Sequence, residues 1–335
     1  MLAGRFELKI GNKVIGETPM LVPAFSSKFE PAIGSIIKQM PEYITGPILI
    51  SAYDVYYRDI TKIKVPITFC SLLFLDSGGY EVSQDRDLAD IVHDDYKPKE
   101  WNKEKYLSVL DNWSYKRPTV IVSYDHPQNK YGTGRQIKIA KSWFKDRKNV
   151  LSEILIKPEP RNKMVSIDNI TENVELLNDF DIVGFTEKEL GRNIIERMEN
   201  IAITRIAMRE RDVARPIHIF GSLDMLSTPL YFIAGADIFD GLTWLRYGYV
   251  NGLSIYEQNF GLITALPLDS TDVYTRGRRV VSNLDELAKL RQKMANYLVD
   301  ADLKKLEQFK SHAGLFRNAF DALRSRLKNR GKEVI

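Results

Sequence analysis

The most restrictive feature of this 335-residue chain is a series of short apolar runs that alternate with longer segments of helical spacing. Each run has the length and continuous hydrophobicity of a strand that is buried on both faces, as in a parallel sheet. We identify eight such runs, namely Met20–Ala24, Ile48–Ala52, Leu72–Leu75, Thr119–Tyr124, Ile154–Ile156, Ile182–Phe185, Ile217–Phe220 and Ile238–Phe239.

The segments between the runs are predicted to be helical, among them Arg135–Arg147, Glu187–Ala207 and Leu226–Gly235, the last of which ends on a glycine. Repeated alternation of strand and helix is typical of a closed barrel, whereas a doubly wound open sheet usually has fewer repeats and an early glycine-rich phosphate loop. No GxGxxG pattern follows the first run. We therefore predict an α/β fold, a (β/α)8 TIM barrel, over residues 1–280.

The two ends of the chain depart from this alternation. Phe6–Ile10 and Lys13–Gly16 flank Gly11 and Asn12 and predict an N-terminal β-hairpin. Ser282 and Asp285 resemble a capping box, so we expect a helix to begin there and a C-terminal basic helical extension to occupy residues 281–335. A stripe at helical spacing predicts that this helix packs on the barrel rather than offering a face to a partner: Leu284, Leu287, Leu290, Met294 and Leu298.

Composition narrows the class of protein. The one cysteine, Cys70, excludes an internal disulfide framework and a zinc site built from several thiolates. Because no apolar stretch approaches about 20 residues and no signal-peptide pattern is present, we expect a soluble cytoplasmic protein with no membrane contact. The formal net charge is +4, and basic residues gather beyond Leu303, where they either contact phosphates or form a solvated helical face. They are Lys304, Lys305, Lys310, Arg317, Arg324, Arg326, Lys328, Arg330 and Lys332.

Three of the apolar runs lead directly into an aspartate: Asp76, Asp125 and Asp240. In a (β/α)8 barrel, the loops that leave the carboxyl ends of the strands converge on one mouth, where the chemistry is found. Each aspartate taken alone is also a common turn residue and helix N-cap. Three at equivalent positions predict a shared polar pocket, because a carboxylate at the end of a buried strand is costly unless it is paired or used.

Glycines and aromatic residues accompany these carboxylates. Gly78 and Gly79 let the backbone approach a ligand closely, and Tyr80 follows them as a flat surface; a tight turn with a packed tyrosine is the alternative. Phe220 and Gly221 repeat the pattern after the seventh run. Two rings that bracket a pocket favour a planar heterocycle as the substrate.

These motifs resemble those of a known family. Asp76-Ser77-Gly78-Gly79-Tyr80-Glu81 resembles the DSGGFQ signature of the tRNA-guanine transglycosylases, and Ala236-Asp237-Ile238-Phe239-Asp240 resembles the segment that carries their nucleophile. The similarity extends from Glu17 to about Tyr249 and includes Phe220-Gly221. Residues 239–247 look closer to archaeal members, and to the DNA 7-deazaguanine transglycosylases, than to the bacterial tRNA enzymes.

The resemblance implies a covalent double displacement. Asp240 would attack C1′ of a nucleoside, expel guanine and hold the sugar as an ester, and Asp76 would move the proton. Asp125 would accept hydrogen bonds from guanine N1 and the exocyclic amine. The other implied substrate contacts surround the base: Ser77, Gly78 and Gly79 in the signature loop, Tyr80 and Phe220 on its faces, the backbone of Gly184 toward O6 or the 7-substituent, and His218 and Gly221 on the wall beside Phe220.

Two residues near these motifs are interpreted from their own positions. A histidine inside an apolar run, such as His218, is more often a core or rim residue than a catalyst, and we assign it no acid or base work. Asp237 alternates away from the pocket if Ile238 and Phe239 are strand, so we expect it to be structural.

The chain departs from the family pattern in three places. The usual zinc site of three cysteines and a histidine is missing, so we expect no metal and no other cofactor. Glu81 stands where glutamine is usual. Lys157 stands where a glutamine is expected at the end of the fifth strand, and it offers donors but no acceptor. These changes leave the reaction type in place and bear on tRNA as the substrate.

The sequence thus predicts an enzyme, a pentosyltransferase that replaces guanine in a nucleic acid, DNA in preference to tRNA, by a 7-deazaguanine such as preQ0. The basic tail and one basic helix would hold the polynucleotide. One alternative is a non-catalytic barrel that binds a nucleobase or nucleic acid within a modification or defence complex, and another is an unrelated barrel hydrolase or lyase with paired carboxylates. Family analogy adds a homodimer as a further expectation. The helix carries Lys138, Lys141, Lys145, Arg147 and Lys148.

Overall fold

The computed structural model describes residues 1–29, 33–57, 67–83, 96–113, 116–125, 130–307 and 313–333. Its centre is a closed barrel of parallel strands in the order β10-β3-β4-β5-β6-β7-β8-β9. The predicted TIM barrel is therefore confirmed, and every predicted apolar run forms a strand of it. The strands are β3 (Met20–Phe25), β4 (Ile48–Ser51), β5 (Leu73–Asp76), β6 (Thr119–Val122), β7 (Leu151–Ile156), β8 (Ile182–Thr186), β9 (Ile217–Phe220) and β10 (Ile238–Gly241).

Strand β10 closes the barrel. It pairs with β3 on one side, where Asp240 lies opposite Val22, and with β9 on the other, where Ile238 lies opposite His218. The first barrel strand in the sequence thus meets the last one. This closure brings the end of β10 beside the ends of strands that precede it by more than a hundred residues.

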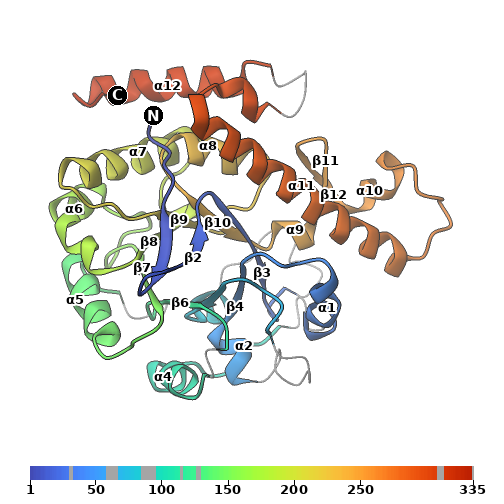
Figure 1. The fold of residues 1–335 in the computed structure, drawn as a ribbon, viewed down its shortest axis with the longest axis horizontal. Helices are drawn as coiled ribbons and strands as arrows, with labels where there is room; N and C mark the ends of the chain where they lie inside the picture. Colours follow the sequence, from blue (N-terminus) through green and yellow to red (C-terminus); the bar gives the residue numbers. More distant parts are fainter. Residues whose placement is uncertain are drawn as a thin grey trace.

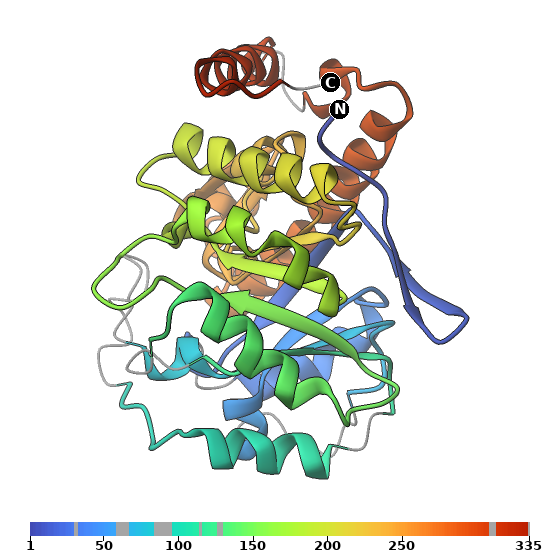
Figure 2. The same ribbon diagram turned by 90° about the vertical axis from the view of Figure 1, so that its left-hand side faces the viewer.

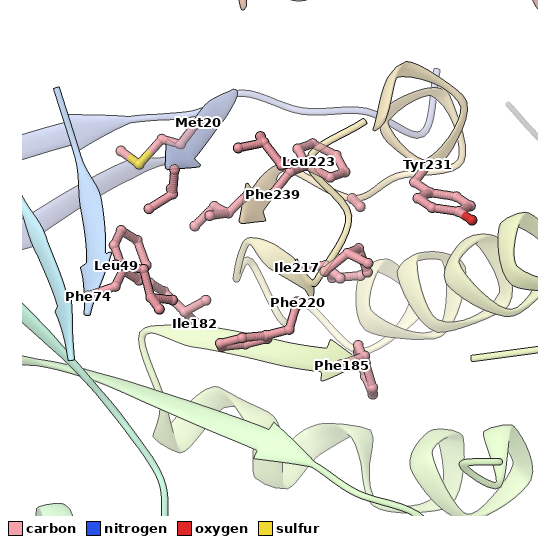
Figure 3. Packing of buried hydrophobic residues seen from close by; sticks show 14 of the residues in the cluster. Met20, Leu49, Phe74, Ile182, Phe185, Ile217, Phe220, Leu223, Tyr231 and Phe239 are labelled. Carbon is pink, nitrogen blue, oxygen red and sulfur yellow. The ribbon is translucent and has the colours of Figure 1, made fainter. Parts of the chain in front are cut away.

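The barrel interior is filled by side chains from opposite strands (Figure 3). Phe74 of β5 meets His218 of β9 with ring centroids 5.5 Å apart, and Leu49 and Ile182 are also buried here. Continuous burial of the strands explains why each one reads as an uninterrupted apolar run in the sequence. The interior is therefore a packed core below the mouth rather than a pore.

Helices surround the barrel (Figures 1 and 2). The predicted helix over residues 135–147 is observed as Thr133–Phe144 and that over 226–235 as Ser227–Ile233, but the one predicted from Glu187 begins only at Ile194, where Asn193 caps it. No helix among the described residues combines the length and apolarity that a bilayer crossing needs. The α-helices are α1 (Ile33–Gln39), α2 (Ala52–Tyr56), α3 (Gly79–Val82), α4 (Lys103–Asn112), α5 (Thr133–Phe144), α6 (Ile167–Glu172), α7 (Ile194–Glu210), α8 (Ser227–Ile233), α9 (Thr243–Arg246), α10 (Glu257–Ile263), α11 (Asp272–Asp300) and α12 (Leu315–Asn329), and short 3-10 turns are η1 (Met40–Glu42), η3 (Val174–Asp179), η4 (Glu187–Glu189) and η5 (Leu303–Leu306).

Two antiparallel hairpins accompany the barrel. The predicted N-terminal hairpin is confirmed as β1 (Glu7–Ile10) paired with β2 (Lys13–Glu17), and it projects from the barrel in Figure 2. A second hairpin, β11 (Tyr247–Val250) with β12 (Leu253–Tyr256), follows β10 and was not predicted.

The predicted start of the C-terminal helix at Ser282 is wrong. Helix α11 begins at Asp272, and Thr271 caps it by accepting a hydrogen bond from the amide of Tyr274. Asn283 lies inside this helix and is fully buried, because its side chain accepts from the amide of Tyr249 and donates to two carbonyl groups of the barrel domain. The boundary expected between residues 280 and 281 therefore falls within α11. The expected apolar stripe does pack on the barrel core through Leu284, Leu287, Leu290, Met294 and Leu298.

The basic tail is docked in part on the barrel domain. Helix α12 lies along α7 in Figures 1 and 2, and Glu199 of α7 binds both Arg326 and Arg330, at 2.5 Å and 2.6 Å. Lys332 pairs with Glu210 at 2.9 Å. Several tail cations thus neutralise carboxylates of the fold itself. Lys310 lies outside the described residues.

Candidate functional site

The three predicted aspartates line one cavity of about 1670 Å³ at the carboxyl end of the barrel strands. Asp76 is the last residue of β5, Asp240 lies in β10, and Asp125 follows β6 by a few residues. Asp76 is 9% exposed and Asp240 5%, so both carboxyl groups lie in a largely desolvated setting. The expected meeting of carboxylates at one mouth is therefore present. His126 and Pro127, which continue the third motif, lie outside the described residues.

Asp76 occupies an electrostatically unfavourable position for a charged carboxyl group. Burial raises its pKa well above the ordinary value, and the negative charges of Asp125, Glu81 and Asp240 raise it further. The amide of Gly78 donates to Asp76 Oδ2 at 3.3 Å and offsets only part of this effect. Asp76 is therefore set up to hold a proton that it can give to a ligand in the cavity.

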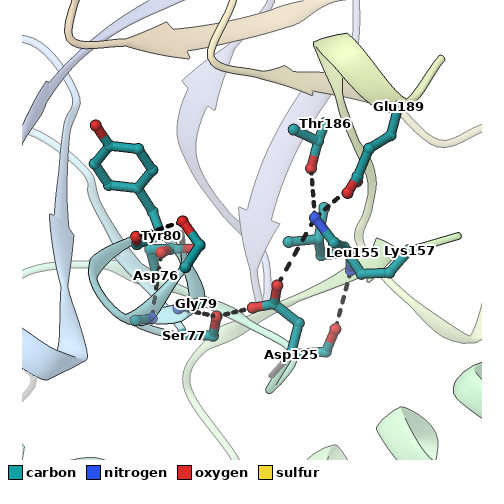
Figure 4. Close-up of polar contacts among 12 residues, drawn as sticks. Asp76, Ser77, Gly79, Tyr80, Asp125, Leu155, Lys157, Thr186 and Glu189 are labelled. Carbon is teal, nitrogen blue, oxygen red and sulfur yellow. Dashed lines mark hydrogen bonds and ion pairs between the residues drawn. The ribbon is translucent and has the colours of Figure 1, made fainter. Parts of the chain in front are cut away.

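The signature loop holds Asp125 in place (Figure 4). Ser77 Oγ donates a hydrogen bond to Asp125 Oδ1, and the amide of Gly79 donates to Ser77 Oγ at 3.3 Å. A Cβ at Gly79 would lie 2.6 Å from both carboxyl oxygens of Asp125, so no side chain fits there. Gly78 has a φ of +91°, which favours glycine. These glycines therefore serve the local packing of the carboxylate as well as any approach of a ligand.

Tyr80 and Phe220 both line the cavity. Tyr80 Oη accepts a hydrogen bond from Arg246 at 2.8 Å, and Lys28 Nζ lies 4.3 Å from the centroid of the ring. Phe220 stacks on His218, with centroids 4.0 Å apart and ring planes at 28°. The two rings are fixed by these contacts at separate walls of the cavity.

Four predicted site residues lie behind the cavity lining rather than in it: Ser77, Gly78, Gly184 and His218. A Cβ at Gly184 would lie 2.6 Å from Phe220 Cε2 and 2.8 Å from Glu153 Oε1, so this glycine is covered by their side chains. On this wall the cavity is instead lined by Lys157, Thr186 and Glu189. Gly221, by contrast, does line the cavity, and its amide donates to Asp240 Oδ1 at 3.2 Å.

Lys157 follows β7 and contacts residues from both neighbouring strands: Asp125, which follows β6, and Thr186 of β8 (Figure 4). Its ammonium group lies 2.7 Å from Glu189 Oε2, 2.9 Å from Thr186 Oγ1 and 3.9 Å from Asp125 Oδ2. The side chain is 27% exposed, so its charge remains within reach of a ligand. A cationic donor therefore lies beside Asp125, the carboxylate that was predicted to form hydrogen bonds with the base.

His218 lies between two carboxylates. Its Nδ1 is 2.7 Å from Glu153 Oε1, and its Nε2 is 3.2 Å from Asp240 Oδ1, in an ionic contact that is less well aligned than a full hydrogen bond. Burial acts to lower the pKa of His218, but the charge of Glu153 and the contacts with Asp240 raise it to about 9. The imidazole is therefore protonated at neutral pH and is more than a neutral core residue.

Glu153 is the main residue of the site that the sequence did not predict. It is fully buried in β7, among apolar neighbours, and burial raises its pKa despite the opposing charge of His218. A charged residue directly before an apolar run was the available signal. Glu81, noted as a departure from the family, is also buried; its carboxyl group accepts from Ser26 at 2.6 Å and Ser51 at 2.8 Å.

Asp237 lies on the opposite face of β10 from Asp240. It pairs with Arg205 of α7 and accepts a hydrogen bond from the amide of Ile217 at 2.8 Å, and both charged side chains are buried. This agrees with the structural role predicted for Asp237.

A shelf of aromatic and basic side chains extends the cavity beyond Asp125. We call it the aromatic shelf, and it consists of Tyr124, Trp143, Tyr131, Lys103, Lys130 and Lys163. Tyr124 and Trp143 are in contact with centroids 6.0 Å apart, and Lys103 Nζ lies 5.1 Å from the Trp143 centroid. The cavity therefore joins a carboxylate-lined floor to a basic, aromatic rim.

Comparisons with known proteins do not assign the chain to a family. No protein-family model matches the sequence, and no curated protein matches it.

Proposed function

We propose that this chain is a base-exchanging transglycosylase that replaces guanine in a nucleic acid, DNA in preference to tRNA, with a 7-deazaguanine such as preQ0. One observation carries the proposal: Asp76 and Asp240 lie at the carboxyl ends of two barrel strands, Asp125 follows a third, and all three line a single cavity together with Tyr80 and Phe220. Each carboxylate has a distinct environment, which is what three distinct roles require.

In the first half of the reaction, a carboxylate oxygen of Asp240 attacks C1′ and the C1′–N9 bond breaks. The electron pair goes to N9 of guanine, which takes a proton from Asp76, and the sugar remains as an ester of Asp240. The raised pKa of Asp76, caused by burial and by its acidic neighbours, supports its role as the proton donor. In the second half, Asp76 takes the proton from the incoming base, whose nitrogen attacks C1′ and releases Asp240.

Base recognition follows from the polarity of the groups at the cavity wall. Asp125 offers acceptors to N1–H and to the exocyclic amine of guanine, an edge on which adenine offers no N1 donor. Lys157 lies 3.9 Å from Asp125 and offers a cationic donor, which suits the O6 acceptor on the same edge. Guanine and 7-deazaguanines share this edge, so one site serves both the leaving and the incoming base.

The size and lining of the cavity support a polynucleotide rather than a free nucleoside. Its volume of about 1670 Å³ exceeds the roughly 300–1,000 Å³ of ordinary small-ligand pockets. The aromatic shelf provides rings for stacking bases, a contact of about 1–3 kcal/mol per base, and lysines for phosphates. The preference for DNA rests on the nucleophile segment and on the missing zinc ligands of the sequence.

The test is exchange of radiolabelled guanine into DNA and into bulk tRNA, with and without preQ0, followed by a denaturing gel. We expect incorporation into DNA and a covalent protein–DNA adduct that survives denaturant. Asp240→Asn abolishes both, whereas Asp168→Asn, which alters an exposed aspartate of α6, leaves both unchanged.

Two outcomes decide against the proposal. Exchange into neither polymer by the wild-type protein refutes it, and guanine binding that persists without exchange then favours the non-catalytic barrel. Full exchange by Asp240→Asn refutes the assigned nucleophile.

A further inference from the structure

We propose that Glu153 and His218 form a buried dyad that positions Asp240, holding its Oδ1 oxygen and leaving Oδ2 directed to the substrate. This inference rests on the proposed function, because it concerns the same nucleophile. Glu153 and His218 do not line the cavity, so they act through Asp240 as positioning residues.

The dyad and the aspartate that it positions come from three strands. Glu153 lies in β7, His218 in β9 and Asp240 in β10, so the contacts join residues far apart in sequence. The spacings are 2.7 Å from Glu153 to His218 and 3.2 Å from His218 to Asp240. Glu153 and His218 are both 0% exposed, so water does not compete for these contacts.

The orientation of Asp240 follows from what its two oxygens contact. Oδ1 lies against His218 Nε2 and accepts the amide hydrogen of Gly221. Among the described residues, Oδ2 has no polar partner. Because Asp240 lines the cavity, the oxygen left for bond formation is Oδ2, and the two contacts at Oδ1 fix the plane of the carboxylate.

When Glu153 and Asp240 are both ionised, the imidazole can contact both carboxylates favourably only in its protonated form, since a neutral ring carries one N–H. A protonated ring places a positive charge beside Asp240, which favours the carboxylate form that the attack consumes. The pKa of about 9 agrees with this state. The charged groups that face His218 are Glu153 and Asp240, and the neighbouring side chains of β5 and β9, Phe74 and Phe220, are uncharged.

A purely structural role explains Glu153 poorly. Its second oxygen, Oε2, is buried without a hydrogen-bond partner among the described residues, and such a group costs stability. Phe220 and Gly184 cover the dyad, so the ring that lines the cavity also seals the imidazole from solvent. The arrangement is costly as packing but suits a group that must keep its charge beside a nucleophile.

The test is the pH dependence of guanine exchange in Glu153→Gln. Loss of the Glu153 charge removes the largest of the effects that raise the pKa of His218 from 6.5 to about 9, whereas burial, which lowers the pKa, remains. We therefore expect kcat in Glu153→Gln to fall at least about tenfold at pH 8 and by a smaller factor at pH 6. The KM for guanine stays unchanged, because Glu153 does not line the cavity. Asp168→Asn, which alters an exposed aspartate of α6, is the control and leaves the pH profile unchanged.

A second measurement separates this inference from the proposed function. NMR titration of the His218 ring needs no activity, and the chain has only four histidines to assign. We expect a midpoint above pH 8 in the wild type that both Glu153→Gln and Asp240→Asn lower. A midpoint near 6.5 that neither variant moves overturns the dyad, as does an equal loss of kcat at pH 6 and pH 8 or no loss at either. Absence of exchange in the wild type with the expected titration refutes the function alone.

Discussion

The buried pair between Asp237 and Arg205 gives a quantitative test of how the outer face of β10 is stabilised. Asp237 is 0% exposed and Arg205 1%. The guanidinium also donates to the carbonyls of Gly235 and Arg215, at 2.9 Å and 2.8 Å. Burial raises the pKa of Asp237 to about 6 although the Arg205 charge acts against this, so desolvation offsets much of the attraction. Asp237→Asn leaves a buried guanidinium without its counter-charge, and we expect a loss of about 3–5 kcal/mol in the free energy of unfolding.

A double-mutant cycle separates the pair from the rest of the packing. Arg205→Met leaves the opposite charge buried, whereas Arg205→Met combined with Asp237→Asn leaves no buried charge at this position. The double variant should therefore cost at least about 1 kcal/mol less than the sum of the two single variants. Urea unfolding at pH 7.5, followed by tryptophan fluorescence and linear extrapolation, measures all four free energies.

Asp240→Asn is the matched control, because it alters an aspartate of β10 on the cavity side, three residues after Asp237. We expect it to cost less stability than Asp237→Asn while abolishing guanine exchange. Asp237→Asn should retain exchange at a temperature where it is folded. Single-variant losses that add to within about 0.5 kcal/mol would show that the two side chains do not form an energetic pair, and the reasoning would fail.

Three further changes test other parts of the structure. Gly184→Ala places a Cβ 2.6 Å from the Phe220 ring, so we expect about 1–3 kcal/mol of destabilisation in urea unfolding and weaker guanine binding in calorimetry. Burial and the charge of Asp54 raise the pKa of Glu81 from 4.5 to about 7, so the folded state loses stability as the pH rises from 4.5 through 7, by about 3 kcal/mol in total. We expect Glu81→Gln to remove this dependence of stability on pH, which urea unfolding at several pH values measures. Glu199→Gln releases α12, and faster amide exchange in that helix should accompany a loss of about 1–2 kcal/mol.

Each of these has a result that contradicts it. Unchanged guanine affinity in Gly184→Ala would mean that Phe220 does not shape the base site. If the free energy of unfolding of Glu81→Gln still falls as the pH rises, another group causes the pH dependence. If the amides of α12 exchange at the wild-type rate in Glu199→Gln, apolar contacts alone hold this helix.

The barrel strands were predictable because burial on both faces leaves a direct mark on the sequence. β3 and β4, for example, are buried at every position, and apart from Ser51 at the end of β4 their residues are apolar. The three aspartates were predictable for the same reason, since each marks the point where such a run reaches the mouth. Local sequence therefore carried both the scaffold and the carboxylates that it positions.

The features that were missed depend on contacts between distant segments. Glu153 lay just before the predicted run Ile154–Ile156 and was not selected, because its partner His218 lies 65 residues further along the chain. Helix α11 was predicted to start too late because Ser282 and Asp285 resemble a capping box, whereas the observed cap is Thr271 and Asn283 inside the helix is satisfied by the barrel domain. Neither partner is visible within a window of local sequence.

The closure of the barrel by β10 has a consequence for how the proposed activity would arise during synthesis. Asp76 and Asp125 emerge from the ribosome long before Asp240, and β10 must insert between β3 and β9 before the carboxylates share a cavity. A nascent chain that ends before β10 lacks the proposed nucleophile Asp240 and also the strand that closes the barrel. Base exchange would therefore require a closed barrel. During refolding, the recovery of exchange activity should lag behind the recovery of helical structure.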